Sequence, residues 1–186
     1  MDVVFFDASV LFKAAVTRFL LGAAQSGEFR AIWSELVVTE ARRNLLAADR
    51  PHAAAALEQN IGLVRDPVVA PSDAVAAKLG LTDVGDRHVL AAAANGDASV
   101  LVTSNVRHFD PTEAASLGVA VLAPDALATS VATRNPSALT RHVQRTPPDR
   151  LLGTSRSSHE SSPDDGDPHP ISRRMSVRLP RRGTPR

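Results

Sequence analysis

Two short, unbroken apolar runs constrain the fold of this chain most strongly. Residues 3–6 (VVFF) end at Asp7, and residues 99–102 (SVLV) end at Thr103. Short runs rich in β-branched and aromatic residues are typical of strands that are buried on both faces of a sheet. The stretches around them show the helical spacing of apolar residues. Because strands alternate with helices, the sequence predicts a three-layer α/β/α sandwich with a mostly parallel central sheet.

The same patterns place the other elements. Further strands are expected at residues 31–33 and 119–122, and helices at residues 10–20, 34–46, 51–63, 72–79, 83–94, 112–117 and from residue 124 onward. Ser9 and Ser34 are candidate N-caps of the first two helices. The expected apolar stripe of the second helix consists of Leu36, Val37, Ala41, Leu45 and Leu46.

Cysteine content excludes several kinds of site, and the distribution of charge and proline divides the chain into two parts. None of the 186 residues is cysteine, which excludes disulfide scaffolds, zinc–thiolate sites and cysteine nucleophiles. Residues 1–145 carry 13 Lys/Arg against 15 Asp/Glu, whereas residues 146–186 carry 8 against 5 and hold 7 of the 13 prolines. We expect a folded domain over residues 1–145 and a disordered Pro/Arg/Ser-rich tail over residues 146–186.

The sequence shows neither a membrane span nor a signal for export. Its apolar runs are far shorter than the roughly 20 residues that cross a bilayer. Asp2 and Asp7 bracket the first apolar run, which is unlike the basic start of a signal peptide. A cytoplasmic protein without membrane contact is expected.

Polar residues follow both buried strands and predict a site at one edge of the sheet. Asp7 comes directly after the first strand, and Asn105 lies just past residues 99–102. The carboxyl ends of parallel strands meet at one edge, where open α/β sheets bind ligands. A carboxylate after such an apolar run is costly to bury without a cationic partner, which favours a functional role for Asp7. The alternative is an N-cap or turn residue.

Three further acids lie on helices. Glu40 lies beside the apolar face of its helix, where it either binds a metal or pairs with Arg43. Asp83 and Asp86 share one side of a first helical turn, where ordinary N-cap chemistry is the alternative. Together with Asp7 these acids form a set of oxygen ligands without cysteine, and such ligands suit Mg²⁺ or Mn²⁺.

Four motifs in order along residues 2–130 resemble the PIN domain, and in particular the VapC-like toxin ribonucleases. They are Asp7-Ala8-Ser9, Ser34 with Glu40, Asp83-x-x-Asp86-Arg87-His88, and Thr103-Ser104-Asn105-x-x-x-Phe109. The resemblance implies an Mg²⁺- or Mn²⁺-dependent endoribonuclease that hydrolyses RNA phosphodiester bonds. It implies Asp7, Glu40 and Asp86 as catalytic residues and metal ligands, with Asp83 in support. Many members carry a fourth aspartate where this chain has Asn105, which puts a second tightly held metal in question.

Positions near the expected site suggest supporting residues, and the resemblance implies partners. Thr103 and Ser104 can hydrogen-bond the ligating carboxylates or the phosphate, although plain turn residues are the alternative. Arg42, Arg87 and Arg107 lie near the expected site and can bind phosphates, although solvated surface arginines are equally consistent with their positions. The expected partners are RNA, a small cognate antitoxin and a second copy of the chain in a homodimer.

Other functions are weighed against the nuclease. A PIN-fold module that binds RNA or protein without catalysis is conceivable because of Asn105. A phosphate-binding regulator of the receiver kind is disfavoured, since that pocket needs a late lysine and no lysine follows Lys78. A serine hydrolase is disfavoured, since no Gly-x-Ser-x-Gly turn is present.

Overall fold

A four-stranded, fully parallel sheet forms the centre of the fold in the computed structural model, which describes residues 1–64 and 67–136. The strands are β1 (Val3–Phe6), β2 (Arg30–Ile32), β3 (Val100–Val102) and β4 (Ala120–Leu122), in the order β2-β1-β3-β4. The register pairs Phe5 with Ile32 on one side and with Leu101 on the other. β1 and β3 are therefore the central strands, and their carboxyl ends lie side by side.

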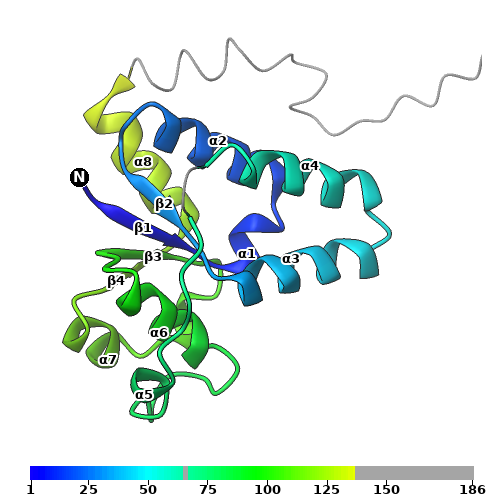
Figure 1. The fold of residues 1–186 in the computed structure, drawn as a ribbon. Helices are drawn as coiled ribbons and strands as arrows, with labels where there is room; N and C mark the ends of the chain where they lie inside the picture. The colour runs from blue at the N-terminus through cyan, green and yellow to red at the C-terminus, as the bar shows by residue number, and fades with distance from the viewer. Residues whose placement is uncertain (65–66, 137–186) are drawn as a thin grey trace, which may run out of the picture. The chain divides into compact units, whose positions relative to one another are not determined.

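Helices cover both faces of the sheet, which confirms the predicted three-layer architecture. They are α1 (Ala8–Leu11), α2 (Ala14–Gln25), α3 (Glu35–Ala47), α4 (Pro51–Ile61), α5 (Asp73–Ala76), α6 (Arg87–Asn95), α7 (Pro111–Ser116) and α8 (Pro124–Arg134), with a 3₁₀ turn η1 (Val106–His108). Figure 1 shows α2, α4 and α8 on one side of the strands and α5, α6 and α7 on the other. The expected tail, residues 146–186, and residues 137–145 of the expected domain lie outside the described residues.

The core lies on both faces of the central strands, as the apolar runs predict. Phe5, Phe6, Leu101 and Val102 are fully buried. Phe6 packs edge-to-face against Phe29, with ring centroids 6.1 Å apart. Within the described ranges 1–64 and 67–136, no helix is long and apolar enough to cross a membrane.

The first predicted helix is two helices. α1 ends at Leu11 and α2 begins at Ala14, with Lys13 between them in a non-helical conformation (φ −95°, ψ 87°). Ser9 is not a cap, because the Asp7 carboxylate accepts the first N–H groups of α1 and starts the helix earlier. The apolar spacing continues across the break, so periodicity could not reveal it. Lys13 is the N-cap residue of α2, where its N–H donates to the carbonyl oxygen of Val10 and its own carbonyl oxygen accepts the N–H of Thr17.

Two further predictions need correction. The helix expected from residue 83 begins at Arg87, because residues 83–86 form a turn in which the carbonyl oxygen of Asp83 accepts the N–H of Asp86 and its carboxylate accepts the N–H of Gly85. On α3, Ser34 is the N-cap as predicted, but Leu36 and Leu46 are 53% and 54% exposed and do not belong to the buried stripe. The other three predicted members of the stripe, Val37, Ala41 and Leu45, are buried as expected.

Candidate metal-binding cleft

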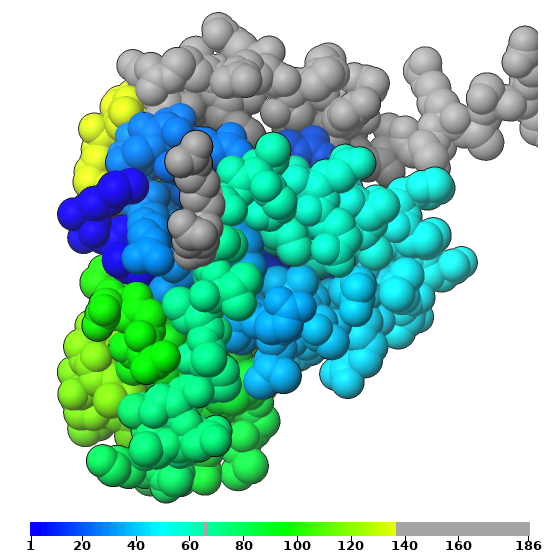
Figure 2. All heavy atoms as spheres, in the orientation of Figure 1, coloured from blue at the N-terminus to red at the C-terminus, as the bar shows by residue number. Residues whose placement is uncertain are grey.

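A cleft of about 700 Å³ opens at the carboxyl ends of the central strands, and three of the predicted acids line it. Asp7 follows β1, Glu40 lies on α3, and Asp86 immediately precedes α6. The rest of the lining consists of Ser9, Phe12, Lys13, Asn44, Ala47, Ala48, Ser104 and Asn105. In Figure 2, the blue and cyan atoms of α3 and α4 form the right-hand side of the visible face, above the green atoms of later helices. The lining residues of the cleft come from residues 7–13, 40–48, 86 and 104–105, so segments far apart in the sequence build it.

Asp7 is the most buried of the three acids, and its carboxylate accepts hydrogen bonds from the backbone and from two hydroxyl groups. The side chain is 3% exposed. Its Oδ1 accepts the N–H of Ala8 at 2.7 Å, and its Oδ2 accepts the hydroxyls of Ser9 at 2.6 Å and Thr103 at 2.7 Å. The two hydroxyls occupy both lone pairs of Oδ2, whereas the contacts among the described residues leave one lone pair of Oδ1 available to a cation. The N-cap and functional interpretations of Asp7 are thus compatible.

The hydroxyls that hold Asp7 are themselves oriented by the backbone. Ser9 Oγ accepts the N–H of Ser104 at 2.9 Å, and Thr103 Oγ1 accepts the N–H of Asn105 at 3.0 Å. With these acceptor sites used, each hydroxyl directs its proton at Asp7. The loop after β3 therefore fixes the carboxylate after β1. Thr103 contacts an acid of the cleft in the way expected, while Ser9, expected as a helix cap, has this unforeseen role.

Glu40 lines the cleft and does not form the ion pair with Arg43 that was its alternative interpretation. Among the described residues it forms no ion pair with Arg43, and Arg42 instead lies 3.9 Å from Glu58. Glu40 also borders a smaller hollow of about 250 Å³, whose lining includes Arg43 and His88. Glu40 is therefore a half-buried acid of the cleft that no cation among the described residues pairs with.

Asp86 belongs to a second group of ligand-type side chains. His108 Nδ1 lies 2.9 Å from Asp86 Oδ2, and Asp83, Asp86 and His108 each offer one ligand atom within 4.8 Å of the others. Asp83 is exposed and does not line the cleft with Asp7 and Glu40. Nothing in the sequence marks His108 as a partner of Asp86, because a contact across 22 residues leaves no local signal.

Glu113 anchors the loop that carries Asp83 and Asp86. Its carboxylate accepts the backbone N–H groups of Gly80, Leu81 and Thr82 at 2.6, 2.8 and 2.8 Å. These hydrogen bonds, that of Leu81 foremost, lower the pKa of Glu113 from its ordinary 4.5 to about 2, against an opposing contribution from burial. No nearby motif marks Glu113 in the sequence, since it lies more than 30 residues from the loop.

The three expected phosphate-binding arginines lie in different surroundings. Arg42 is half-exposed beside Glu58. Arg87 donates to the carbonyl oxygens of Thr82 and Gly80 at 3.1 and 3.2 Å, so it braces the same loop as Glu113. Arg107 borders a separate hollow. None of the three lines the cleft of Asp7.

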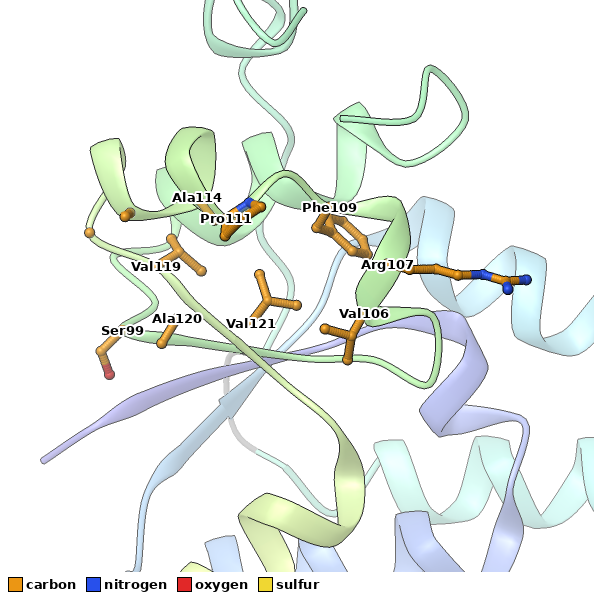
Figure 3. A pocket seen from close by; sticks show the side chains of 11 residues that line it. Ser99, Val106, Arg107, Phe109, Pro111, Ala114, Val119, Ala120 and Val121 are labelled. Carbon is orange, nitrogen blue, oxygen red and sulfur yellow. The ribbon is translucent and has the colours of Figure 1, made fainter. Parts of the chain in front are cut away.

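That separate hollow has a volume of about 650 Å³ and holds none of the candidate acids. Figure 3 shows Val106, Phe109, Val119 and Val121 gathered between α7 and the edge strand β4, while Arg107 extends away from them. Its lining is mainly apolar, so it lacks the oxygen ligands that a divalent cation needs.

The geometry of the cleft agrees with a comparison of the whole sequence. A family model described as a PIN domain matches residues 3–107, which is more than half of the chain. The chain belongs to the PIN domain family. Searches of curated proteins and of solved structures returned no match. PIN domains are in general metal-dependent nucleases that act on RNA, so the family supports a nuclease of that broad type here.

The residues of this PIN domain fit a divalent metal by the chemistry of their donors. Three carboxylates and the Asn105 amide line one cleft, and hard oxygen donors are the ligands that Mg²⁺ and Mn²⁺ prefer. Asp7 Oδ1 has a lone pair available, and Glu40 has no competing cation within ion-pair distance among the described residues. Asn105 contributes an oxygen but no charge, so the cleft holds one formal negative charge fewer than a site with four acids.

Proposed function

We propose that this PIN domain is an Mg²⁺- or Mn²⁺-dependent endoribonuclease that hydrolyses RNA phosphodiester bonds. The observation that carries the proposal is the convergence of Asp7, Glu40 and Asp86, from three distant segments, on one cleft. When bound there, a divalent cation stabilises negative charge on the phosphate and lowers the pKa of a water. Hydrolysis joins the water oxygen to phosphorus and breaks the bond to the 3′ oxygen, leaving 5′-phosphate and 3′-hydroxyl ends.

The chain's own residues have distinct parts in this proposal. Asp7 and Asp86 are the direct ligands, and Glu40 is a ligand or accepts a proton of the attacking water. Ser9 and Thr103 hold Asp7 in one orientation through hydrogen bonds of 2.6 and 2.7 Å. Preorganised ligands avoid a cost of reorganisation when the cation and substrate bind.

The decisive experiment is cleavage of labelled RNAs in the presence of Mg²⁺ or Mn²⁺. The wild-type protein should cut, and Asp7→Asn and Asp86→Asn should lose activity by a factor of at least about 100, since each removes a charged ligand. Asp125→Asn is the matched control, because Asp125 lies on α8, outside the cleft. Circular dichroism separates lost chemistry from lost folding, which matters most for the buried Asp7. Wild-type protein that cuts no RNA, or Asp86→Asn protein that cuts normally, would contradict the proposal.

We further propose that the nuclease is the toxin of a type II toxin–antitoxin pair, occluded by a small cognate antitoxin, and that it forms a homodimer. The VapC-like motifs of the sequence support this role. Expression of the chain alone should arrest bacterial growth, and the Asp86→Asn variant should not. Growth that is indifferent to both proteins would argue against a toxin.

A PIN-fold module that binds RNA or protein without catalysis is the second candidate, and Asn105 is the observation that favours it. An amide in this position lowers the negative charge of the cleft. Wild-type protein that binds RNA but does not cut it with either metal would favour this alternative.

A further inference from the structure

Lys13 occupies an unusual place in a cleft of acids. It stands between α1 and α2 and lines the cleft together with Asp7, Glu40 and Asp86. Among the described residues, it is the only lysine or arginine in that lining.

The Lys13 ammonium is held by a hydroxyl and not by a carboxylate. Its Nζ donates to Ser104 Oγ at 3.0 Å, across 91 residues of sequence. The ion pairs among the described residues are Arg42–Glu58, His108–Asp86 and Arg134–Asp2, so Lys13 neutralises none of the acids of the cleft. An ammonium has three donors, and the Ser104 hydroxyl uses one of them. The charge and the two other donors remain available to an anion.

Asp7 and Lys13 lie at different depths in the cleft. Asp7 is buried at its base, whereas Lys13 is exposed at its rim. An RNA strand with its scissile phosphate at the acids would pass the rim with a neighbouring phosphate. Lysine binds phosphate as a point charge and needs no bidentate geometry.

The residue before Lys13 extends this wall. Phe12 also lines the cleft, and the guanidinium carbon of Arg50 lies 5.4 Å from the centroid of its ring. Surfaces that bind single-stranded nucleic acid combine cations with aromatic rings in this way. The wall that contains Phe12 and Lys13 therefore has the composition of a strand-binding surface.

We propose that Lys13 binds a backbone phosphate of the RNA next to the scissile one, an inference that rests on the proposed nuclease function. Lys13 is then a substrate-binding residue whose effect falls mainly on KM. Because Lys13 contacts a phosphate and no base, its contribution to affinity is the same for RNAs of unrelated sequence.

The chain offers a matched control, since Lys13 and Lys78 are its two lysines. Lys78 is exposed after α5 and does not line the cleft. Binding is measured by fluorescence anisotropy with two short, labelled single-stranded RNAs of unrelated sequence, in the Asp86→Asn background over a series of salt concentrations. Lys13→Gln should weaken the binding of both RNAs about fivefold and reduce the magnitude of the slope of log K against log salt by about 0.7. Lys13→Arg should keep the affinity and the salt slope of the parental protein, and Lys78→Gln should change neither quantity.

Binding and cleavage separate this inference from the proposed function. If the wild-type protein cuts RNA and Lys13→Gln keeps the parental affinity and salt slope, the role of Lys13 is wrong and the nuclease stands. If no RNA is cut but Lys13→Gln still lowers the affinity and the slope, the phosphate contact stands and the nuclease does not. In a cutting enzyme, Lys13→Gln should raise KM by a similar factor, and a change confined to kcat would overturn the binding role.

Discussion

Replacement of Thr103 by valine tests how firmly the fold holds Asp7. The substitution keeps the shape of the side chain but removes the hydroxyl that donates to Asp7 Oδ2 at 2.7 Å and accepts the N–H of Asn105 at 3.0 Å. Thr103 is fully buried, so water cannot easily replace the lost contact. A hydrogen bond to a charged group contributes about 1.5–3 kcal/mol. We therefore expect Thr103→Val to lower the free energy of unfolding by about 2–3 kcal/mol.

Thermal unfolding at neutral pH measures this loss. A domain of this size loses roughly 3–4 °C of Tm per kcal/mol, so Tm should fall by about 6–12 °C. Thr103→Ser is the control, since it keeps the hydroxyl and should cost only about 1 kcal/mol for the lost methyl group. Mn²⁺ should also bind Thr103→Val more weakly than the wild-type protein, because the carboxylate of Asp7 is no longer held in one orientation.

A double-mutant cycle shows whether the effect passes through Asp7. In an Asp7→Asn background, the acceptor is neutral, and Thr103→Val should cost about 1 kcal/mol less than in the wild-type background. The reasoning is refuted if Thr103→Val unfolds within about 2 °C of the wild-type protein, or if its cost is the same in both backgrounds.

Three other substitutions give separate tests. Glu113 has a folded pKa of about 2 against an ordinary 4.5, so its stabilising contribution is complete above pH 4.5 and is lost as the pH falls toward 2. Over that range, the Tm of Glu113→Gln should fall less steeply than the Tm of the wild-type protein. Parallel curves of Tm against pH would contradict the role of its hydrogen bonds. A Cβ at Gly96 would lie 2.5 Å from Cδ1 of the buried Ile32, so Gly96→Ala should lose about 1–3 kcal/mol in chemical denaturation, and an unchanged midpoint would show that Ile32 moves freely. Asn105→Asp adds a carboxylate to the cleft and should tighten Mn²⁺ binding in calorimetry, whereas equal or weaker affinity would place this side chain outside the ligand set.

Local patterns in the sequence were sufficient for the layers of the fold. The run at residues 3–6 became β1 with the predicted bounds, and the run at residues 99–102 became β3, one residue shorter. Since both strands are central in a parallel sheet, the residues after them had to meet at one edge. That rule alone brings Asp7 and Asn105 to the same cleft, and the position of Glu40 on α3 brings it there as well.

Local patterns in the sequence did not predict the contacts between distant segments. Apolar spacing predicted a helix over residues 10–20 because the spacing persists across the break at Lys13. First-turn acids predicted a helix from residue 83, but the N–H of Asp83 donates to the carbonyl oxygen of His108 and residues 83–86 form a turn, so the helix begins at Arg87. At Asp83, a contact with a distant segment outweighs the local preference for a helix start.

The sequence by itself determined the architecture, the edge of the sheet that carries the site, and the acids that gather there. These follow from the local periodicity of apolar residues and from the general rule that the carboxyl ends of parallel strands meet at one edge of the sheet. Only the tertiary structure decided that Asp86 contacts His108, that Ser9 and Thr103 together hold Asp7, and that Lys13 reaches Ser104 inside the cleft. Those contacts join residues up to 96 positions apart, and they depend on where whole helices and loops pack and not on the spacing of neighbours along the chain.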